Sequence, residues 1–178
     1  MTVKPINLGI IMRKAGVSIF FLLFLALFQG CYSFSGSSLP VHIKTLAIPV
    51  FDDRSGAGIA QFRVELTKGL VNRIESQSNL RCIPSASRAD ALLAGSIVSF
   101  SDAPSQLSSI TERALKNRIT LVVQVTMSEQ NNKVPIFTQS YVGFADYSIG
   151  NYIAQQEAIR LALNQIIDDI FDRVVSGW

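Results

Sequence analysis

The sequence predicts an α+β fold, a two-layer sandwich in which two amphipathic helices pack on a mostly antiparallel sheet of four to five strands. Three observations predict it. Two segments repeat apolar residues every three or four positions, several others alternate apolar with polar residues, and two alternating segments are separated by a short polar turn. With 178 residues, 48% of them hydrophobic, the chain is long enough for one such core and a targeting segment.

An export signal is expected at the N-terminus. The stretch from Ala15 to Phe28 carries no charged residue and follows the basic residues Lys4, Arg13 and Lys14. It is shorter than the roughly 20 apolar residues of a transmembrane helix, and a basic flank before a short apolar run is typical of a signal peptide. A start at Met12 instead of the first residue would give a shorter basic head and the same interpretation.

The apolar run ends at a sequence that resembles a lipobox, where bacterial lipoproteins receive diacylglycerol and are cleaved. Gly30 and Cys31 fit the pattern, whereas Phe28 and Gln29 depart from its usual Leu and Ala or Ser. We therefore expect residues 1–30 to be a lipoprotein signal peptide and Cys31 to be the lipid attachment site. An uncleaved N-terminal anchor and an ordinary signal peptide cut elsewhere are the alternatives.

Residues 31–41 are the expected lipidated tether, because Tyr32 to Pro40 is rich in Ser and Gly and ends in proline. Bacterial sorting that retains lipoproteins in the inner membrane usually reads Asp at the second position, so Tyr32 favours the outer membrane. Loss of the signal peptide would leave 13 acidic residues and an equal number of basic ones. A neutral mature chain gives no indication of nucleic-acid binding.

The domain, residues 42–178, is expected to open with a strand and a helix. Ile43 to Phe51 places apolar residues at alternate positions, which predicts a strand. Gly56 and Gly58 belong to a turn that leads into the helix, because the segment lacks the Lys of a P-loop and the third glycine of a dinucleotide motif. The helix begins near Ile59, and its apolar stripe is Ile59, Phe62, Leu66, Leu70 and Ile74.

Further strands and a second helix complete the prediction. Asn117 to Ser128 shows the clearest alternation, and a turn at 131–133 joins it to a neighbouring strand at Ile136 to Tyr147. Asn151 to Val175 predicts the final helix. The other expected elements are a short strand at Leu80–Ile83, a strand at Ala91–Phe100 with Leu92, Ala94, Val98 and Phe100 on one side, and a loop at Asp102–Ser109 containing Pro104.

No catalytic or metal-binding pattern is present, so we expect neither an enzyme nor a cofactor. The single histidine, His42, has no Cys, Asp or Glu near it in the sequence and is expected at the surface. The adjacent pairs Asp52-Asp53 and Asp168-Asp169 point to different faces and cannot cooperate as acid and base. Cys82 lies in an apolar strand and is expected to be a buried small side chain without a disulfide partner.

One basic cluster is a candidate binding site. Arg113, Lys116 and Arg118 lie at the start of the clearest strand and could meet phosphates through charge-assisted hydrogen bonds. An ordinary polar loop and strand edge is the alternative interpretation.

The chain resembles the LptE family of the lipopolysaccharide assembly machine, in the form found in Bacteroidetes- and Chlorobi-like bacteria. The resemblance covers nearly all of the mature chain. It rests on residues 31–36 (CYSFSG), residues 39–49 (LPVHIKTLAIP) with Phe51 and Arg54 after them, residues 89–95 (ADALLAG) and the terminal Gly177-Trp178.

The resemblance implies an outer-membrane lipoprotein, anchored on the periplasmic side, with two helices on a mixed or antiparallel sheet. It also implies that the protein partners the LptD β-barrel as a plug and assembly factor in delivering lipopolysaccharide to the cell surface. Arg113, Lys116 and Arg118 would be candidates for contact with the glycolipid. The opening strand, turn and helix are also similar to CsgG- or LpoB-type lipoproteins, which form secretion pores or activate peptidoglycan synthases.

Overall fold

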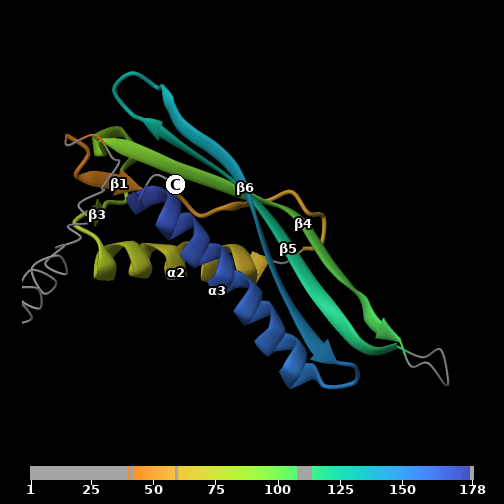
Figure 1. The fold of residues 1–178 in the computed structure, drawn as a ribbon. Coiled ribbons are helices and arrows are strands. Elements are labelled where there is room, and N and C mark those ends of the chain that lie inside the picture. The colour runs from red at the N-terminus through yellow and green to blue at the C-terminus, as the bar shows by residue number, and fades with distance from the viewer. Residues whose placement is uncertain (1–39, 41, 59, 108–113, 177–178) are drawn as a thin grey trace, which may run out of the picture. The chain divides into compact units, whose positions relative to one another are not determined.

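The computed structural model describes residues 40, 42–58, 60–107 and 114–176. Within these ranges two α-helices accompany a six-stranded sheet (Figure 1). In chain order the elements are β1 (Thr45–Ala47), β2 (Asp52–Asp53), α2 (Ala60–Gln77), β3 (Arg81–Cys82), a short 3-10 helix (Ala86–Arg88), β4 (Ala91–Leu107), β5 (Ala114–Glu129), β6 (Pro135–Ser148) and α3 (Tyr152–Ser176).

The sheet is mixed and its strand order is β3-β1-β4-β5-β6, with β2 also paired to β4. The long strands β4, β5 and β6 form an antiparallel meander. The short strands run parallel to their neighbours: β1 to β3 and β4, and β2 to β4. This confirms the predicted α+β fold. The one strand that was not predicted, β2, is two residues long and too short to produce a periodic pattern.

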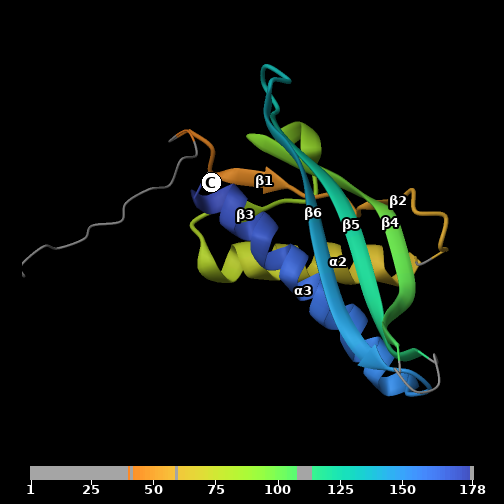
Figure 2. The ribbon, with the colours of Figure 1, turned by 45° about the vertical axis from the view of Figure 1, so that its right-hand side comes forward.

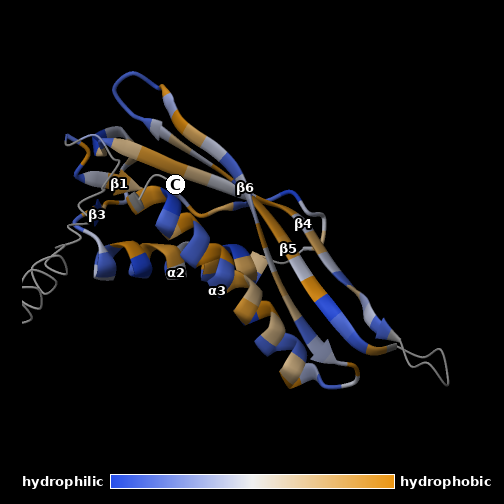
Figure 3. Cartoon of the chain, in the orientation of Figure 1, coloured by the Kyte–Doolittle hydropathy of each residue, from blue (hydrophilic) through white to orange (hydrophobic). Residues whose placement is uncertain are grey.

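The core lies between the sheet and the two helices, which cover the same face (Figure 2). Both predicted helical stripes are buried, except that Ile59 lies outside the described residues. In Figure 3, hydrophobic and hydrophilic residues alternate along much of the long strands, because successive side chains of a strand point to opposite faces of the sheet. The fully buried row of β5 is Ile119, Leu121, Val123, Val125 and Met127, as predicted.

Helix α3 packs closely against β6 because the strand has a glycine, Gly143, where the helix contacts it. A Cβ atom at Gly143 would collide with the carbonyl oxygen of Ala162 on α3. The helix backbone therefore rests directly on the strand, which is one reason that α3 follows β6 along the sheet.

The opening strand is shorter than predicted. Strand β1 ends at Ala47, and Val50 is 54% exposed although the alternating pattern placed it with the buried side chains. Pro49 has no N–H to donate, so the ladder cannot continue past it. Phe51 is buried instead, and its ring occupies the space that a Cβ atom would need at Gly95.

The inner face of β4 also differs from the prediction. Leu93 and Ile97 are fully buried, whereas Leu92 and Ala94 lie on the opposite face and are only partly buried. A register shift between Ile97 and Ser99 adds one residue, so that Phe100 returns to the core side. Such a bulge exchanges the two faces of a strand and breaks the period-two pattern.

The predicted loop at Asp102–Ser109 is wrong, because β4 continues to Leu107. Its last residues pair with β5, with Pro104 opposite Asn117. Strand β2 pairs with β4 only at Ser96 and Ile97, so among the described residues β4 has no neighbour on its other side at Pro104. Proline is tolerated at such an edge because no ladder bond is lost.

The described helices were also compared with the requirements of a membrane span. Neither α2 nor α3 combines the length and the hydropathy that crossing a bilayer demands.

Candidate functional site

Two residues of the predicted basic cluster, Lys116 and Arg118, lie at the end of the meander where β4, β5, β6 and the first turn of α3 meet, which we call the distal end. Arg118 is ion-paired there. Across the β5–β6 pair, its Nε donates to Asp146 Oδ1 at 2.7 Å and its Nη2 donates to Oδ2 of the same carboxylate at 3.0 Å. The guanidinium carbon also lies 4.9 Å from the centroid of the Phe144 ring.

This ion pair changes what Arg118 can do. Hydrogen bonding from Arg118 holds the pKa of Asp146 below its usual value. The guanidinium is therefore committed to a carboxylate and an aromatic ring. Lys116, two residues away, is exposed, and no ion pair of Lys116 occurs among the described residues. Arg113 lies outside the described residues.

A second feature of the distal end is a carboxylate that joins four elements. Asp102 on β4 accepts hydrogen bonds from Asn117 Nδ2 at 2.8 Å, Tyr147 Oη at 2.6 Å and Gln155 Nε2 at 2.8 Å. Burial opposes its ionisation, but these bonds outweigh burial and hold the pKa of Asp102 below its usual value. We call Asp102, Asn117, Tyr147 and Gln155 the Asp102 cluster. It fixes the start of α3 to all three long strands.

Beyond the Asp102 cluster the distal end exposes large apolar side chains. Leu115 is 52% exposed, Ile149 46%, Tyr152 72% and Ile153 81%. Lys116 pairs with Ser148, so Leu115 and Ile149 follow at the same end of two neighbouring strands. We call these four side chains and Lys116 the distal patch: they share this end of the molecule, although Leu115 and Lys116, as neighbours in β5, point to opposite faces of the sheet. Clustered exposed apolar side chains are typical of interaction sites.

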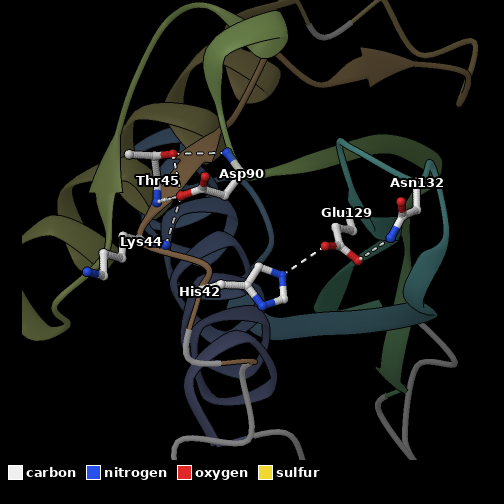
Figure 4. Close-up of polar contacts among 6 residues, drawn as sticks. All are labelled: His42, Lys44, Thr45, Asp90, Glu129 and Asn132. Atoms are coloured by element: carbon white, nitrogen blue, oxygen red, sulfur yellow. Dashed lines mark hydrogen bonds and ion pairs between the residues drawn. The ribbon is translucent and has the colours of Figure 1, made fainter.

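The opposite end of the sheet holds a polar site around the start of the domain (Figure 4). Asp90 Oδ2 accepts hydrogen bonds from the N–H groups of Lys44 and Thr45 at 2.9 and 2.8 Å and from Thr45 Oγ1 at 2.7 Å. These bonds, the first from Lys44, keep the pKa of Asp90 low. Asp90, Lys44 and Thr45 also line an open pocket together with His42 and Arg88.

His42 is exposed, as predicted, and has an acidic partner from a distant part of the chain. Its Nε2 lies 2.8 Å from Oε1 of Glu129, at the end of β5 (Figure 4). The carboxylates of Asp90 and Glu129 thus attach residues 42–45 to the start of β4 and the end of β5 through hydrogen bonds and an ion pair. The carboxylates serve the fold, and we assign this pocket no ligand.

The remaining candidate residues have structural roles. Cys82 is partly buried, and burial, reinforced by the charge of Glu75, raises its pKa to about 11. Its thiol is therefore poorly ionised. Asp168 is ion-paired with Arg73 of α2 at 2.9 Å. No group of three His, Cys, Asp or Glu side chains suited to a metal ion occurs in the described ranges.

Solved structures show that this fold recurs in bacterial proteins of low sequence similarity. A protein from Xanthomonas campestris aligns with a TM-score of 0.58 and 13% identity, covering 76% of this chain and 86% of its own. Lipoprotein B from Nitrosomonas europaea aligns with a TM-score of 0.54 and 12% identity, covering 84% and 92%. At such identities the likeness concerns the fold alone.

Sequence comparison identifies the family. No curated protein matches this chain. The family model described as LptE, lipopolysaccharide-assembly, matches residues 43–174, a range that runs from two residues before β1 almost to the end of α3. The match covers most of the chain and all of the sheet, and the chain therefore belongs to the LptE family of lipopolysaccharide-assembly proteins.

Proposed function

We propose that this protein is an outer-membrane lipoprotein, anchored through Cys31 on the periplasmic side, that partners an LptD-type β-barrel. It would act there as a plug and assembly factor in delivering lipopolysaccharide to the outer leaflet. Family membership supports the pathway. The observation that carries the proposal at the level of the site is the distal patch, which suits an amphiphilic ligand.

The distal patch matches the chemistry of a phosphorylated glycolipid. The Lys116 ammonium offers three donors to a phosphate, and the exposed side chains of Tyr152 and Ile153 offer apolar area to acyl chains. Arg118 is held by Asp146, so we propose that it supports this surface and that Lys116 makes the direct contact. Arg113 stays a candidate on chemical grounds.

The position of the distal patch also suits transfer away from the anchor. The domain begins beside the start of β4, since Leu46 of β1 pairs with Ala91. The distal patch lies at the other end of that strand, which has 17 residues and spans about 50 Å at 3.3 Å per residue. A tether of residues 31–41 would thus hold one end near the membrane while the patch reaches into the lumen of a barrel.

A polar outer surface is what a plug in an aqueous lumen requires. The sheet face opposite the helices is partly polar. It carries Thr126 and Thr138, whose Oγ1 atoms lie 3.1 Å apart, and the exposed Gln124 and Ser140, next to the exposed apolar Val142 and Phe144. These groups can exchange hydrogen bonds with polar barrel walls and water.

The proposal is tested by purification of the tagged full-length chain from detergent extracts of its own cells. We expect an LptD-type barrel in near-equal amount, with lipopolysaccharide in the same fraction. Lys116→Ala combined with Tyr152→Ser should lower the lipopolysaccharide content and leave the barrel bound. Lys68→Ala, an exposed change on α2, is the matched control. Recovery of the chain without a barrel would refute the partnership.

A further inference from the structure

The first turn of α3 makes little contact with the core. No residue from Tyr152 to Glu157 is buried, and Ala158 is the first residue of the helix that is. In Figures 1 and 2 this turn lies at the end of the domain opposite β1. Helix ends without apolar packing fray readily, because their outermost residues gain little from burial. The turn therefore needs polar contacts to stay formed.

Polar contacts of two kinds hold this turn. Asn151 caps the helix, since its Oδ1 accepts the N–H of Ala154 at 3.0 Å. Gln155 connects the turn to the sheet, because its Nε2 donates to Asp102 Oδ2 at 2.8 Å and to Tyr147 Oη at 3.3 Å. The cap is local to the chain. The bond between Gln155 and Asp102 is therefore what attaches the turn to β4.

Asp102 also supplies a charge that the helix lacks at this end. The first turn of α3 contains no acidic residue. Negative charge near a helix N-terminus is stabilising, because the unpaired N–H groups there carry partial positive charge. Burial opposes the ionisation of Asp102, but its hydrogen bonds hold its pKa below the usual value, so the carboxylate is ionised at neutral pH. Its bond to Gln155 is thus a charge-assisted one.

The same turn carries half of the apolar side chains of the distal patch. Tyr152 and Ile153 are more exposed than Leu115 and Ile149. Side chains this exposed have little packing of their own, so their positions follow from the helical backbone of the turn. If the turn frays, the helix begins near Ala158 and the distal patch loses Tyr152 and Ile153 as parts of an ordered surface.

We propose that Asp102 is a positioning residue: its hydrogen bond to Gln155 keeps the first turn of α3 formed, and binding at the distal patch requires that turn. Asp102 acts through Gln155 and does not contact the ligand. The inference rests on the proposed function for its ligand, because the distal patch is where we propose that lipopolysaccharide binds. The order of the turn does not depend on that ligand and can be measured without it.

The first measurement is amide hydrogen exchange of the full-length chain in detergent, read by mass spectrometry at residues 156–158. The N–H groups of these residues bond to carbonyls of the first turn, so they report whether it is formed. Gln155→Ala should speed exchange there by about fivefold, the factor that one net hydrogen bond contributes. Asn117→Ala is the matched control, because it removes an amide donor from Asp102 Oδ1 and leaves both bonds to Oδ2 in place. It should change exchange by less than about twofold.

An exchange of donor and acceptor separates the bond from the side chains that make it. Gln155→Glu alone places two carboxylates against each other and should speed exchange at least as much as Gln155→Ala. Asp102→Asn combined with Gln155→Glu restores a donor opposite an acceptor. Exchange at residues 156–158 should then return to within about twofold of the parent. If the two changes merely destabilised the distal end, their effects would add instead.

The second measurement is the capture of fluorescently labelled lipopolysaccharide by the same variants. When the binding-competent state is only partly populated, the affinity falls by that fraction. Gln155→Ala should therefore weaken capture by up to about fivefold, and the combined variant should restore it. Asn117→Ala should weaken capture by less than about twofold.

Three results would overturn the inference: equal exchange in Gln155→Ala and the parent, no recovery in the combined variant, or full capture by a variant whose first turn has frayed. A parent chain that captures no lipopolysaccharide would refute the proposed function and the binding half of the inference. The exchange at residues 156–158 would still decide whether Asp102 positions the turn.

Discussion

Replacement of Asp102 by alanine should destabilise the domain and loosen its distal end. The change removes the acceptor of three hydrogen bonds, from Asn117, Tyr147 and Gln155. A hydrogen bond contributes about 0.5–1.5 kcal/mol net, and the lower half of this range applies because Asp102 is exposed to water. We therefore expect a loss of about 2 kcal/mol in the free energy of unfolding, or about 6 °C in melting temperature.

The effect of Asp102→Ala should depend on pH in a defined direction. The pKa of Asp102 is lowered in the folded protein, so its contribution is fully present above the pKa of the unfolded state, about 3.9. That contribution is lost as the pH falls through the folded-state value. The difference between parent and variant should be constant from pH 6 to 8 and shrink below about pH 4.

Urea unfolding of the mature domain measures both effects. Asp102→Asn keeps the volume and one acceptor oxygen, so it should cost about half as much as alanine. Asp52→Ala on β2, an exposed carboxylate, is the control and should change stability by less than about 0.5 kcal/mol. An Asp102→Ala domain as stable as the parent at pH 7, or a difference that grows in acid, would refute the reasoning.

Three further predictions follow from the packing and the surface charges. Gly143→Ala should cost about 3 kcal/mol in urea unfolding, because its Cβ meets the Ala162 backbone and α3 must move; an unchanged midpoint would contradict the close contact. Cys82, with a pKa of about 11 against 9.0 for a free thiol, should react with iodoacetamide about tenfold more slowly at pH 8 in the folded domain than in urea, because its smaller thiolate fraction outweighs the higher nucleophilicity of that thiolate; equal rates would show that it is not shielded. Arg118→Ala should leave the urea midpoint close to that of the parent, since the pair with Asp146 is exposed, and a clear drop would mean that the ring contact with Phe144 matters more than the charge.

The elements with one strongly buried face could be predicted from the sequence. Helices α2 and α3 and strand β5 each present a continuous apolar row to the core, and burial preserves the corresponding period in the sequence. The sequence-based predictions failed where local backbone geometry interrupts the apolar pattern. Pro49 ends β1, and the bulge after Ile97 exchanges the faces of β4. A single apolar pattern cannot reveal an inserted residue.

The candidate site could be predicted only in part. Arg118 was identified by its charge, but its partner Asp146 lies 28 residues away and becomes adjacent only through the β5–β6 register. The Asp102 cluster was missed because residues 102–109 were predicted to be a loop. If that segment is taken as a strand, the hairpin register places Asp102 opposite Ile119 and on the same face as Asn117, two residues away in β5. The acidic partner of His42 is 87 residues distant and left no local signal.

The CsgG- and LpoB-type alternative loses its support at the level of the family. Its likeness was limited to the opening strand, turn and helix, whereas the LptE match includes the whole meander and most of α3. Cys31, the tether and the outer-membrane location stay proposals, since they concern residues before the described part of the chain.

The most direct test of the central claim is depletion of this protein in its own cells, followed by measurement of lipopolysaccharide exposed at the cell surface. We predict that surface lipopolysaccharide falls while total lipopolysaccharide is retained, and that the full-length chain restores it whereas Cys31→Ala does not. Unchanged surface lipopolysaccharide in cells that lack the protein would contradict the account.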